Sequence, residues 1–357
     1  MKIAVQELMA SQRWYLASMD GTTASYTEMD EASFASSPFL DNRIVLPPSG
    51  KKFKTRIQAI ATSEPWAAKP PPAPHRFILH ISHVGSTLLS RVAGVSPTCL
   101  SLREPVPLRF LAQNLQDQGT HSAWQSPKAF DALTDFALSN LGRPLGDRTR
   151  VVVKCTSWVN PLAEHFFTKG AVQPMQVVGV HVPLENFVAN TLKGNGGLQD
   201  LRSNAQSRMK RLQKLLPGFD RALYSMNWGQ IAAMSWLCEI LTIRQVCNQP
   251  GVQLKWLNFD DFMQDPQAQA RDLAKHLALD WDDQTDSLLS DSGVLAKYSK
   301  ANKAVDFTND ERIRVLDKFK QDNQALMTSA SAWVREVISA DAKLMAWLGS
   351  AEQFPHI

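Results

Sequence analysis

The chain has 357 residues, of which 44% are hydrophobic and 20% are charged, and this composition excludes a disordered chain. Its formal net charge of +4 suits an anionic ligand, but it does not amount to the concentrated basic patch expected of a nucleic-acid-binding protein. The four cysteines form no C-x-x-C pair and no zinc-like spacing with histidines, so neither a metal site nor a disulfide framework is expected.

The first residues do not show the pattern of a signal peptide. Residues 1–18 contain Gln, Glu and Arg where a signal peptide needs an unbroken apolar core, and no later run of 18 apolar residues follows. We therefore expect a cytoplasmic protein in a reducing compartment, with no membrane span.

Residues 1–75 are expected to form an N-terminal extension that ends in a connector. Residues 1–50 mix short apolar pieces with Ser, Thr and Asp, which allows small strands or a helix against the main body. The run KPPPAPH at 69–75 lacks backbone donors and favours polyproline geometry. The main domain should therefore cover residues 76–357.

The main domain alternates β-rich runs with helical patterns. Continuous apolar runs, typical of buried parallel strands, lie at 76–81, 98–102, 150–155, 175–182 and 252–259. Apolar residues at spacings of three and four, typical of amphipathic helices, lie at 130–141, 185–194, 230–247 and 266–279. The sequence thus predicts an α/β fold with a buried parallel sheet and helical crossovers.

The segment 202–221 is basic and helical in pattern. We interpret it as a solvated helix face over Met209, Leu212 and Leu216, and the alternative is that it flanks a site for an acidic substrate. Its cationic residues are Arg202, Arg208, Lys210, Arg211, Lys214 and Arg221.

The stretch FILHISHVGSTLLSR at 77–91 runs from a strand through a tight turn into a helix. Such a turn gathers unpaired backbone N–H groups and the positive end of a helix, which together bind phosphate or sulfate. Gly85 allows close backbone approach, and Ser86 and Thr87 add hydroxyl donors. The G-x-x-x-x-G-K-[ST] motif of ATPases is absent, because Ser86 replaces its lysine. The alternative is that Gly85 only permits a tight turn.

Three motifs in order, FILHISHVGSTLLSR, CLSLREP and RVVVKCTSW, resemble the sulfotransferase family, especially its bacterial branch. The resemblance extends from about residue 76 to about 310, and includes the C-terminal pieces at 256–279 and 296–307. It implies a P-loop NTPase-like three-layer α/β/α fold with a central parallel sheet. It also implies 3′-phosphoadenosine 5′-phosphosulfate (PAPS) as sulfuryl donor, adenosine 3′,5′-bisphosphate as product, and no catalytic metal.

The resemblance places the 5′-phosphosulfate on the turn. The cradle would consist of backbone amides and hydroxyls of the residues that match the family's motif. The family's basic residue, which neutralises charge on the bridging oxygen, falls on His83, which would have to be protonated for that role. The alternative is that His83 only hydrogen-bonds the turn. The predicted cradle is His83, Val84, Gly85, Ser86, Thr87 and Leu88.

The resemblance places Glu104, in LREP, where one branch of the family keeps a glutamate as general base. The other branch uses a histidine in a K-x-H stretch, which reads Lys154, Cys155, Thr156 here. Glu104 is therefore the preferred base, and Lys154 would touch the sulfate or the acceptor. The alternative for Glu104 is a surface carboxylate paired with Arg103 or Arg109.

The 3′-phosphate element of the family, R-D-P-x-x-x-x-x-S, is altered here to VHVPLENFVAN. Its arginine falls on His181 or Val182, and its serine falls near Ala189 or Asn190. His181 and Asn190 remain candidate phosphate contacts. Two further candidates for the donor site are Lys193 and the C-terminal pair Ser299 and Lys300, although a solvent-exposed loop lysine is an alternative for Lys300.

The resemblance implies a sulfotransferase that moves a sulfuryl group to a hydroxyl or amine of a small molecule or glycan. Trp158 is a candidate for the acceptor cleft. Two other interpretations stay open. One is a kinase-like phosphotransferase on the same fold, and the other is a non-catalytic member that serves as a binding module.

Overall fold

The computed structural model describes the chain except residues 1–2, 118–125, 168–173, 292, 296–307 and 350–357. Its centre is a five-stranded parallel sheet with the strand order β5-β6-β4-β7-β8. The strands are β4 (Arg76–His80), β5 (Cys99–Arg103), β6 (Arg150–Lys154), β7 (Met175–His181) and β8 (Val252–Asn258). All five strands predicted from the apolar runs are present, since strands covered on both faces carry apolar residues throughout.

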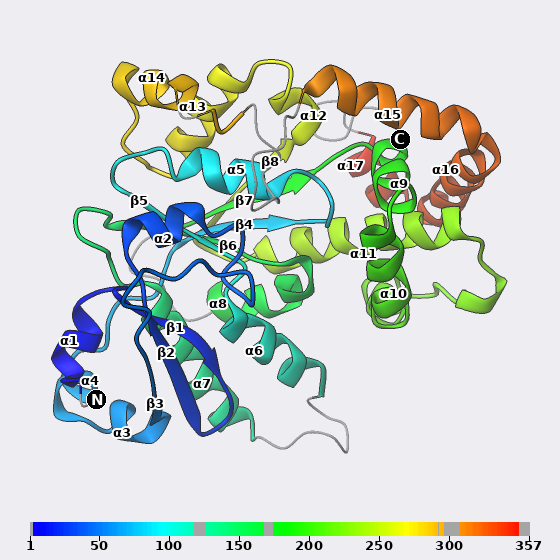
Figure 1. Cartoon of the computed structure of the whole chain (residues 1–357). Helices are drawn as coiled ribbons and strands as arrows, with labels where there is room; N and C mark the ends of the chain where they lie inside the picture. Colours follow the sequence, from blue (N-terminus) through cyan, green and yellow to red (C-terminus); the bar gives the residue numbers. More distant parts are fainter. Residues whose placement is uncertain (1–2, 118–125, 168–173, 292, 296–307, 350–357) are drawn as a thin grey trace.

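Helices cover both faces of this sheet and complete three layers (Figure 1). One face carries α5 (Ser86–Ala93) and α13 (Pro266–His276), with α12 (Phe259–Phe262) and α14 (Asp283–Asp291) beside them. The other face carries α8 (Ala163–Phe167) and α11 (Trp228–Cys247). The predicted three-layer α/β/α fold with a central parallel sheet is confirmed.

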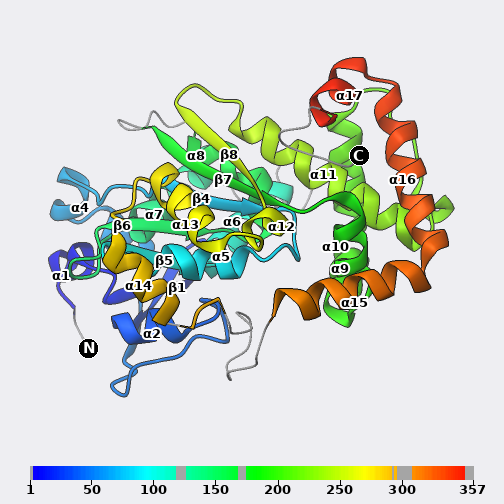
Figure 2. The same cartoon turned by 90° about the horizontal axis from the view of Figure 1, so that it is seen from above.

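The remaining helices of the main domain lie around this core. They are α6 (Val106–Asp117), α7 (Pro127–Leu141), α9 (Leu184–Leu192), α10 (Asn195–Leu215), α15 (Asn309–Asp322), α16 (Gln324–Ser339) and α17 (Ala342–Leu348), with the 3₁₀ turns η1 (Ser157–Leu162) and η2 (Leu223–Ser225). In Figure 2, α9, α10, α15, α16 and α17 gather at one end of the molecule. Within the described residues, no helix combines the length and the apolar character needed to cross a membrane.

The N-terminal residues form a small antiparallel sheet of their own. Its strands are β1 (Trp14–Met19), β2 (Thr23–Glu28) and β3 (Lys52–Arg56), in that order, with the helices α1 (Val5–Ala10), α2 (Glu31–Ser36), α3 (Ile57–Ala61) and α4 (Glu64–Ala68) around them. The aromatic residues Trp14, Tyr26 and Phe53 pack together on one face. The Tyr26 hydroxyl donates to Asn140 Oδ1 of α7 at 3.0 Å, which fixes this face to the main body.

The basic segment after residue 201 only partly matches its interpretation as a solvated face. Met209 and Leu212 are buried, as predicted, and Lys210 and Lys214 are exposed. Arg208, however, is 3% exposed, and both Arg208 and Arg211 form ion pairs with the buried Glu239 of α11. The interpretation is therefore wrong for these two arginines, because a buried carboxylate on the neighbouring helix draws them inward.

Candidate functional site

The turn between β4 and α5 is held in left-handed backbone conformations. Gly85, which precedes the first residue of α5, has φ +75°, and Ser82 and His83 have φ 75° and 53°. Left-handed conformations are unfavourable for residues with a Cβ atom and collect at functional sites. The side chains of His80 and Ser157 support the turn, since His80 Nδ1 accepts from Ser82 N–H at 3.0 Å and the Ser82 and Ser157 hydroxyls lie 3.1 Å apart.

The turn presents a run of backbone donors. Among the described residues, the N–H groups of Val84, Gly85, Ser86 and Thr87 have no hydrogen-bond acceptor. The Thr87 hydroxyl is also buried without a partner among the described residues. Buried donors without acceptors are rare in folded proteins, and consecutive N–H groups at a helix start bind anions. The turn therefore fits a phosphate or sulfate group.

The ring of Phe259, just after β8, covers the turn. A Cβ atom added to Gly85 would lie 2.2 Å from this ring, so no larger residue fits there without displacing Phe259. Gly85 is thus favoured by its positive φ and required by its close contact with the ring. His83 is partly buried in the same turn, and its predicted role as a charge stabiliser stays a prediction.

Glu104 and Lys154 meet at the adjacent strand ends. Lys154 Nζ donates to Glu104 Oε1, and Arg109 Nη2 donates to Glu104 Oε2 at 2.6 Å. Lys154 is 1% exposed, and burial lowers the pKa of its ammonium although the Glu104 carboxylate opposes this shift. Glu104 has a positive φ of 55°, and its N–H donates to the Lys154 carbonyl at 2.8 Å. Glu104 therefore pairs with Arg109, as the interpretation of a surface carboxylate predicted, and it pairs with Lys154 as well.

The N-terminal extension contributes to the same cluster. Arg109 also reaches Asp41 Oδ2 at 3.4 Å, and the Phe39 ring centre lies 5.6 Å from Lys154 Nζ. Burial opposes ionisation of Asp41, but hydrogen bonds from Arg43 outweigh it and hold the pKa of Asp41 below its ordinary value. Sequence reasoning did not identify Asp41 or Phe39, because no motif connects them with LREP.

The candidate 3′-phosphate contacts on β7 and α9 have different surroundings. His181 is 1% exposed and packs edge-on against Trp256 at 5.8 Å, and burial lowers the pKa of its imidazole to about 4. Its place in the core argues against a contact with phosphate. Asn190 is partly buried. Lys193 lies at the C-terminal end of α9, where burial and then the nearby Arg312 lower its pKa.

Arg312 is a cation near the turn that sequence reasoning missed. It lies on α15, its guanidinium is 5.3 Å from the centre of the Phe259 ring, and it forms an ion pair with Asp260. Asp260 Oδ2 also accepts from Asn186 Nδ2 at 2.6 Å, which ties α9 to the residues after β8. The cation therefore reaches the turn region from a helix far along the chain.

Three other predicted contacts are not placed at this site by the described residues, and their roles stay predictions. Ser299 and Lys300 lie outside the described residues. Trp158 of η1 is partly buried and packs against the hydrophobic core. Among the described residues, no three His, Cys, Asp or Glu side chains are arranged to hold a metal ion.

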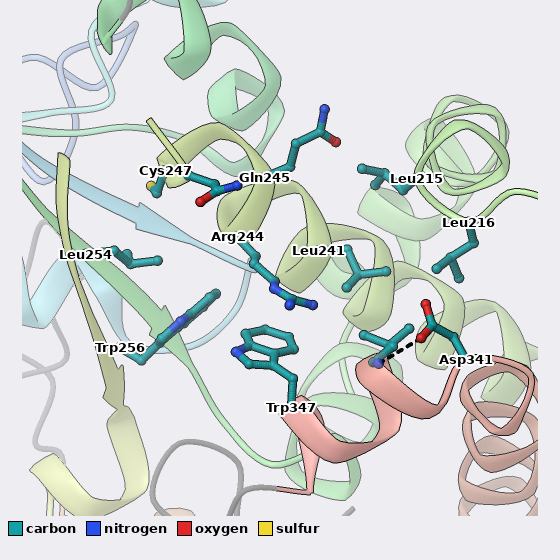
Figure 3. Close-up of a pocket in the computed structure, with 12 residues that line it drawn as sticks. Leu215, Leu216, Leu241, Arg244, Gln245, Cys247, Leu254, Trp256, Asp341 and Trp347 are labelled. Atoms are coloured by element: carbon teal, nitrogen blue, oxygen red, sulfur yellow. Dashed lines mark hydrogen bonds between the residues drawn. The ribbon is translucent and has the colours of Figure 1, made fainter. Parts of the chain in front are cut away.

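A separate cavity of about 570 Å³ lies between α11, β8 and α17 (Figure 3). Arg244 points into it, with its guanidinium 4.1 Å from the ring centre of Trp347, and Trp256 lies beside them. None of the predicted site residues lines this cavity. The strand-end turn, rather than this cavity, therefore carries the chemistry that the sequence indicates.

No family model matches the sequence, and no curated protein matches it. Solved structures with some similarity include the sulfotransferase domain from the Synechococcus PCC 7002 olefin synthase, with 13% identity and a TM-score of 0.38 over 74% of this chain and 95% of that chain. The sulfotransferase domain from the curacin biosynthetic pathway has 13% identity and a TM-score of 0.39, over 74% and 98%. Sulfotransferase STF9 from Mycobacterium avium has 10% identity and a TM-score of 0.39, over 74% and 81%. TM-scores this low establish neither family membership nor function.

Proposed function

We propose that this protein is a sulfotransferase that moves a sulfuryl group from PAPS to a hydroxyl or amine acceptor. The observation that carries the proposal is the turn at 84–87, where four consecutive N–H groups lack an acceptor among the described residues. A carboxylate and a buried ammonium, Glu104 and Lys154, stand at the neighbouring strand ends. An anion cradle beside a base and a cation is what sulfuryl transfer needs.

The donor would be held at both of its charged ends. The turn N–H groups and the Thr87 hydroxyl would bind the 5′-phosphosulfate. The family's 3′-phosphate arginine is missing, and Lys193 and Arg312 are candidates to replace it, since Arg312 lies against the ring that covers the turn and interacts with Lys193. Lys193 forms no ion pair with any described residue, whereas a phosphate would compete with Asp260 for Arg312.

PAPS would supply a sulfuryl group whose bond to the bridging phosphate oxygen breaks as the acceptor oxygen bonds to sulfur. Glu104 would take the proton of the acceptor hydroxyl. Lys154 would offset the negative charge that develops, and His83 would do the same at the bridging oxygen if it is protonated. These roles require no metal.

The two cations on Glu104 limit how it acts as a base. Each of its carboxylate oxygens already accepts a hydrogen bond, one from Lys154 and one from Arg109. The acceptor hydroxyl must therefore approach a second lone pair of Glu104 or displace Arg109, whose side chain is 35% exposed and the easier partner to move.

A kinase-like phosphotransferase is the rival on the same fold. It needs a lysine at the turn and a bound Mg²⁺, and Ser86 occupies the lysine position. A non-catalytic binding module is the other rival, and the loss of the 3′-phosphate arginine favours it.

Melting curves with adenosine 3′,5′-bisphosphate test the donor site. A ligand at 100 times its Kd stabilises the folded state by about 2.7 kcal/mol, so we expect a clear rise of the melting temperature. Adenosine 5′-phosphate, which lacks the 3′-phosphate, should give a smaller rise, and Lys193→Gln should reduce the difference between the two ligands.

The same series separates the rivals. A larger rise with ATP and Mg²⁺ than with the bisphosphate would favour the phosphotransferase. No rise with millimolar bisphosphate would overturn the proposed function. Binding of the bisphosphate without formation of a sulfated product from PAPS, across hydroxyl and amine acceptors, would favour the binding module.

A further inference from the structure

The loop that follows α2 is fixed over the end of β5. Arg103, at the last position of β5, is 3% exposed, and its guanidinium donates to the carbonyl oxygens of Phe34 and Ser37. In return, the N–H of Leu40 donates to the Arg103 carbonyl at 2.8 Å. The N-terminal extension is therefore attached to the residue that directly precedes Glu104.

The same loop places charged and aromatic side chains around Glu104. Asp41 forms ion pairs with Arg43 at 2.5 Å and with Arg109 at 3.4 Å, and Arg109 in turn binds Glu104. The Phe39 ring lies against Arg43, whose guanidinium is 3.7 Å from the ring centre. Asp41 and Glu104 thus share one arginine, and the N-terminal extension forms one wall of the space beside Glu104.

A cavity of about 800 Å³ begins at Asp41 and continues along the N-terminal sheet. We call it the N-terminal cavity. One side is formed by residues of β1, β2 and β3, Tyr26 and Phe53 among them, and the other side is the loop at 41–46. Its size falls in the range of small-molecule sites. The lining residues that matter here are Ser25, Thr27, Asp41, Ile44, Lys52 and Lys54.

Two buried hydroxyls on this face lack partners. Tyr15 and Thr27 are direct cross-strand neighbours of β1 and β2, and they are 0% and 2% exposed. Among the described residues, neither the Tyr15 hydroxyl nor the Thr27 hydroxyl has a hydrogen-bond partner. Burying a hydroxyl unsatisfied is unfavourable, and of these two residues only Thr27 borders the cavity. A ligand in the N-terminal cavity would instead meet the partly exposed hydroxyls of Ser18 and Ser25, which also line it.

The far part of the cavity is cationic. Lys52 pairs with Thr27 and Lys54 pairs with Ser25 across β2 and β3, so both lysines stand on the cavity face. Neither lysine forms an ion pair with a described residue, and both are exposed. The cavity thus has the hydroxyls of Ser18 and Ser25 along its floor and Asp41 next to the Glu104 cluster at one end. Two exposed lysines stand along β3, of which Lys54 also interacts electrostatically with the surface carboxylate of Asp20.

We propose that the N-terminal cavity is the acceptor site and that it takes a polyhydroxylated acceptor carrying a negative charge, such as a sugar acid. A hydroxyl of the acceptor is directed past Asp41 toward Glu104, and the anionic group lies on Lys52 and Lys54. This inference rests on the proposed sulfotransferase function, because that function makes Glu104 the base.

The test measures binding of D-glucuronate and of neutral D-glucose by calorimetry, with and without adenosine 3′,5′-bisphosphate. We expect D-glucuronate to bind at least tenfold more tightly than D-glucose. The double variant Lys52→Gln/Lys54→Gln should lose at least tenfold in D-glucuronate affinity while its bisphosphate affinity stays unchanged. The matched control Lys210→Gln/Lys214→Gln removes two exposed lysines of α10 and should change neither affinity.

A third variant tests the floor of the cavity. Ser25→Ala removes a partly exposed hydroxyl that lines the cavity, and it should weaken D-glucuronate and D-glucose binding by similar factors of about 3 to 10. D-Glucose 6-phosphate distinguishes a carboxylate from a phosphate as the anionic group, since the better of the two ligands defines it.

The outcomes separate this inference from the proposed function. Equal affinities for D-glucuronate and D-glucose, an unchanged affinity in the Lys52→Gln/Lys54→Gln variant, or an equal loss in the α10 control would each overturn the acceptor assignment. Binding of D-glucuronate without binding of the bisphosphate would keep the cavity as an anionic sugar site and overturn the sulfotransferase function instead.

Discussion

Two glutamates of the main domain, Glu104 and Glu239, are both carboxylates that pair with cations, but their surroundings differ. Each is largely withdrawn from solvent and binds two cationic side chains, Lys154 and Arg109 for Glu104, and Arg208 and Arg211 for Glu239. Coulomb attraction to paired cations offsets the cost of burying a carboxylate in both cases. The chemistry of the pair alone therefore does not tell a functional carboxylate from a structural one.

The surroundings make the difference. The Glu239 side chain is 2% exposed, and all of its described partners come from the protein interior, including Asn160, which donates to Oε2 at 2.9 Å. Glu104 is 12% exposed, has a left-handed backbone, and stands at the C-terminal edge of the sheet beside the turn. Ligands of parallel α/β sheets bind at that edge. A partly accessible carboxylate there can reach a substrate, whereas an enclosed one between α10 and α11 can only hold helices together.

The cations around Glu239 are correspondingly permanent. Burial opposes the charged form of Arg208, but the carboxylates of Asp200 and Glu239 outweigh it and raise the pKa of Arg208. The pKa of Arg211 is raised as well, again against burial, chiefly by Glu239. Lys154 differs, because burial prevails and lowers the pKa of its ammonium. Lys154 in the Glu104 cluster therefore loses its proton more easily than the arginines that pair with Glu239.

Glu104→Gln should give the largest effect. The amide cannot take the acceptor proton, and loss of a general base lowers rates by about 10² to 10⁴. We expect kcat for sulfated product to fall by at least 100-fold, measured from PAPS with a saturating acceptor. The affinity for adenosine 3′,5′-bisphosphate should stay within twofold of the wild type.

The variant also leaves Lys154 without a carboxylate, so its folding must be checked at the assay temperature. Lys154→Met separates loss of the base from loss of the buried ion pair, because it keeps Glu104 as the base and removes the buried ammonium. A Glu104→Gln protein that is folded and retains wild-type kcat would remove Glu104 as base and make it a second structural carboxylate.

Glu239→Gln should act on stability instead. It leaves the buried Arg208 and Arg211 with less negative charge, and breaking a buried ion pair costs about 3 to 5 kcal/mol. Urea unfolding should show this loss at an unchanged slope, while the bisphosphate affinity of the folded protein stays the same.

A matched control for this variant is Glu336→Gln. Glu336 pairs with Arg221 at the surface, with side chains 61% and 47% exposed, so its loss should cost at most about 1 kcal/mol. Equal effects of Glu239→Gln and Glu336→Gln would contradict the structural role assigned to the enclosed carboxylate.

The two clusters also mark where sequence reasoning succeeds and where it ends. The five strands and the β4–α5 turn could be predicted, because buried strands and a strand-Gly-Ser-Thr-helix pattern are local in the chain. The ion pairs of Asp41 with Arg109 and of Arg312 with Asp260 connect segments far apart in the sequence. They follow from how loops and helices pack, and no spacing along the chain encodes them.

Buried positions were harder to predict than exposed ones for the same reason. The basic pattern after residue 201 predicted a solvated face, but whether an arginine turns inward depends on a carboxylate of the neighbouring helix. His181 was a candidate phosphate contact from its place after a strand, yet its side chain lies in the core against Trp256. The sequence predicts which residues lie at the end of a strand, but the direction of their side chains depends on how the elements pack.

His181 shows a third way to bury an ionisable group, which is to keep it neutral. Its pKa of about 4 in the folded protein lies below its ordinary value of 6.5 because burial disfavours the imidazolium. The unfolded chain therefore binds more protons between these two values, and stability falls as pH decreases through that window. The full loss below it amounts to about 3 kcal/mol.

This pH effect should be smaller than the loss in Glu239→Gln near pH 5, where only part of the window has been crossed. We expect the free energy of unfolding, measured with urea between pH 7 and pH 4.5, to fall less steeply in His181→Leu than in the wild type. His75 and His276, whose pKa values are also lowered, and carboxylates with lowered pKa values such as Glu28 contribute to the slope that remains. Identical slopes in the two proteins would mean that His181 is protonated when folded, which would reopen its predicted role as a phosphate contact.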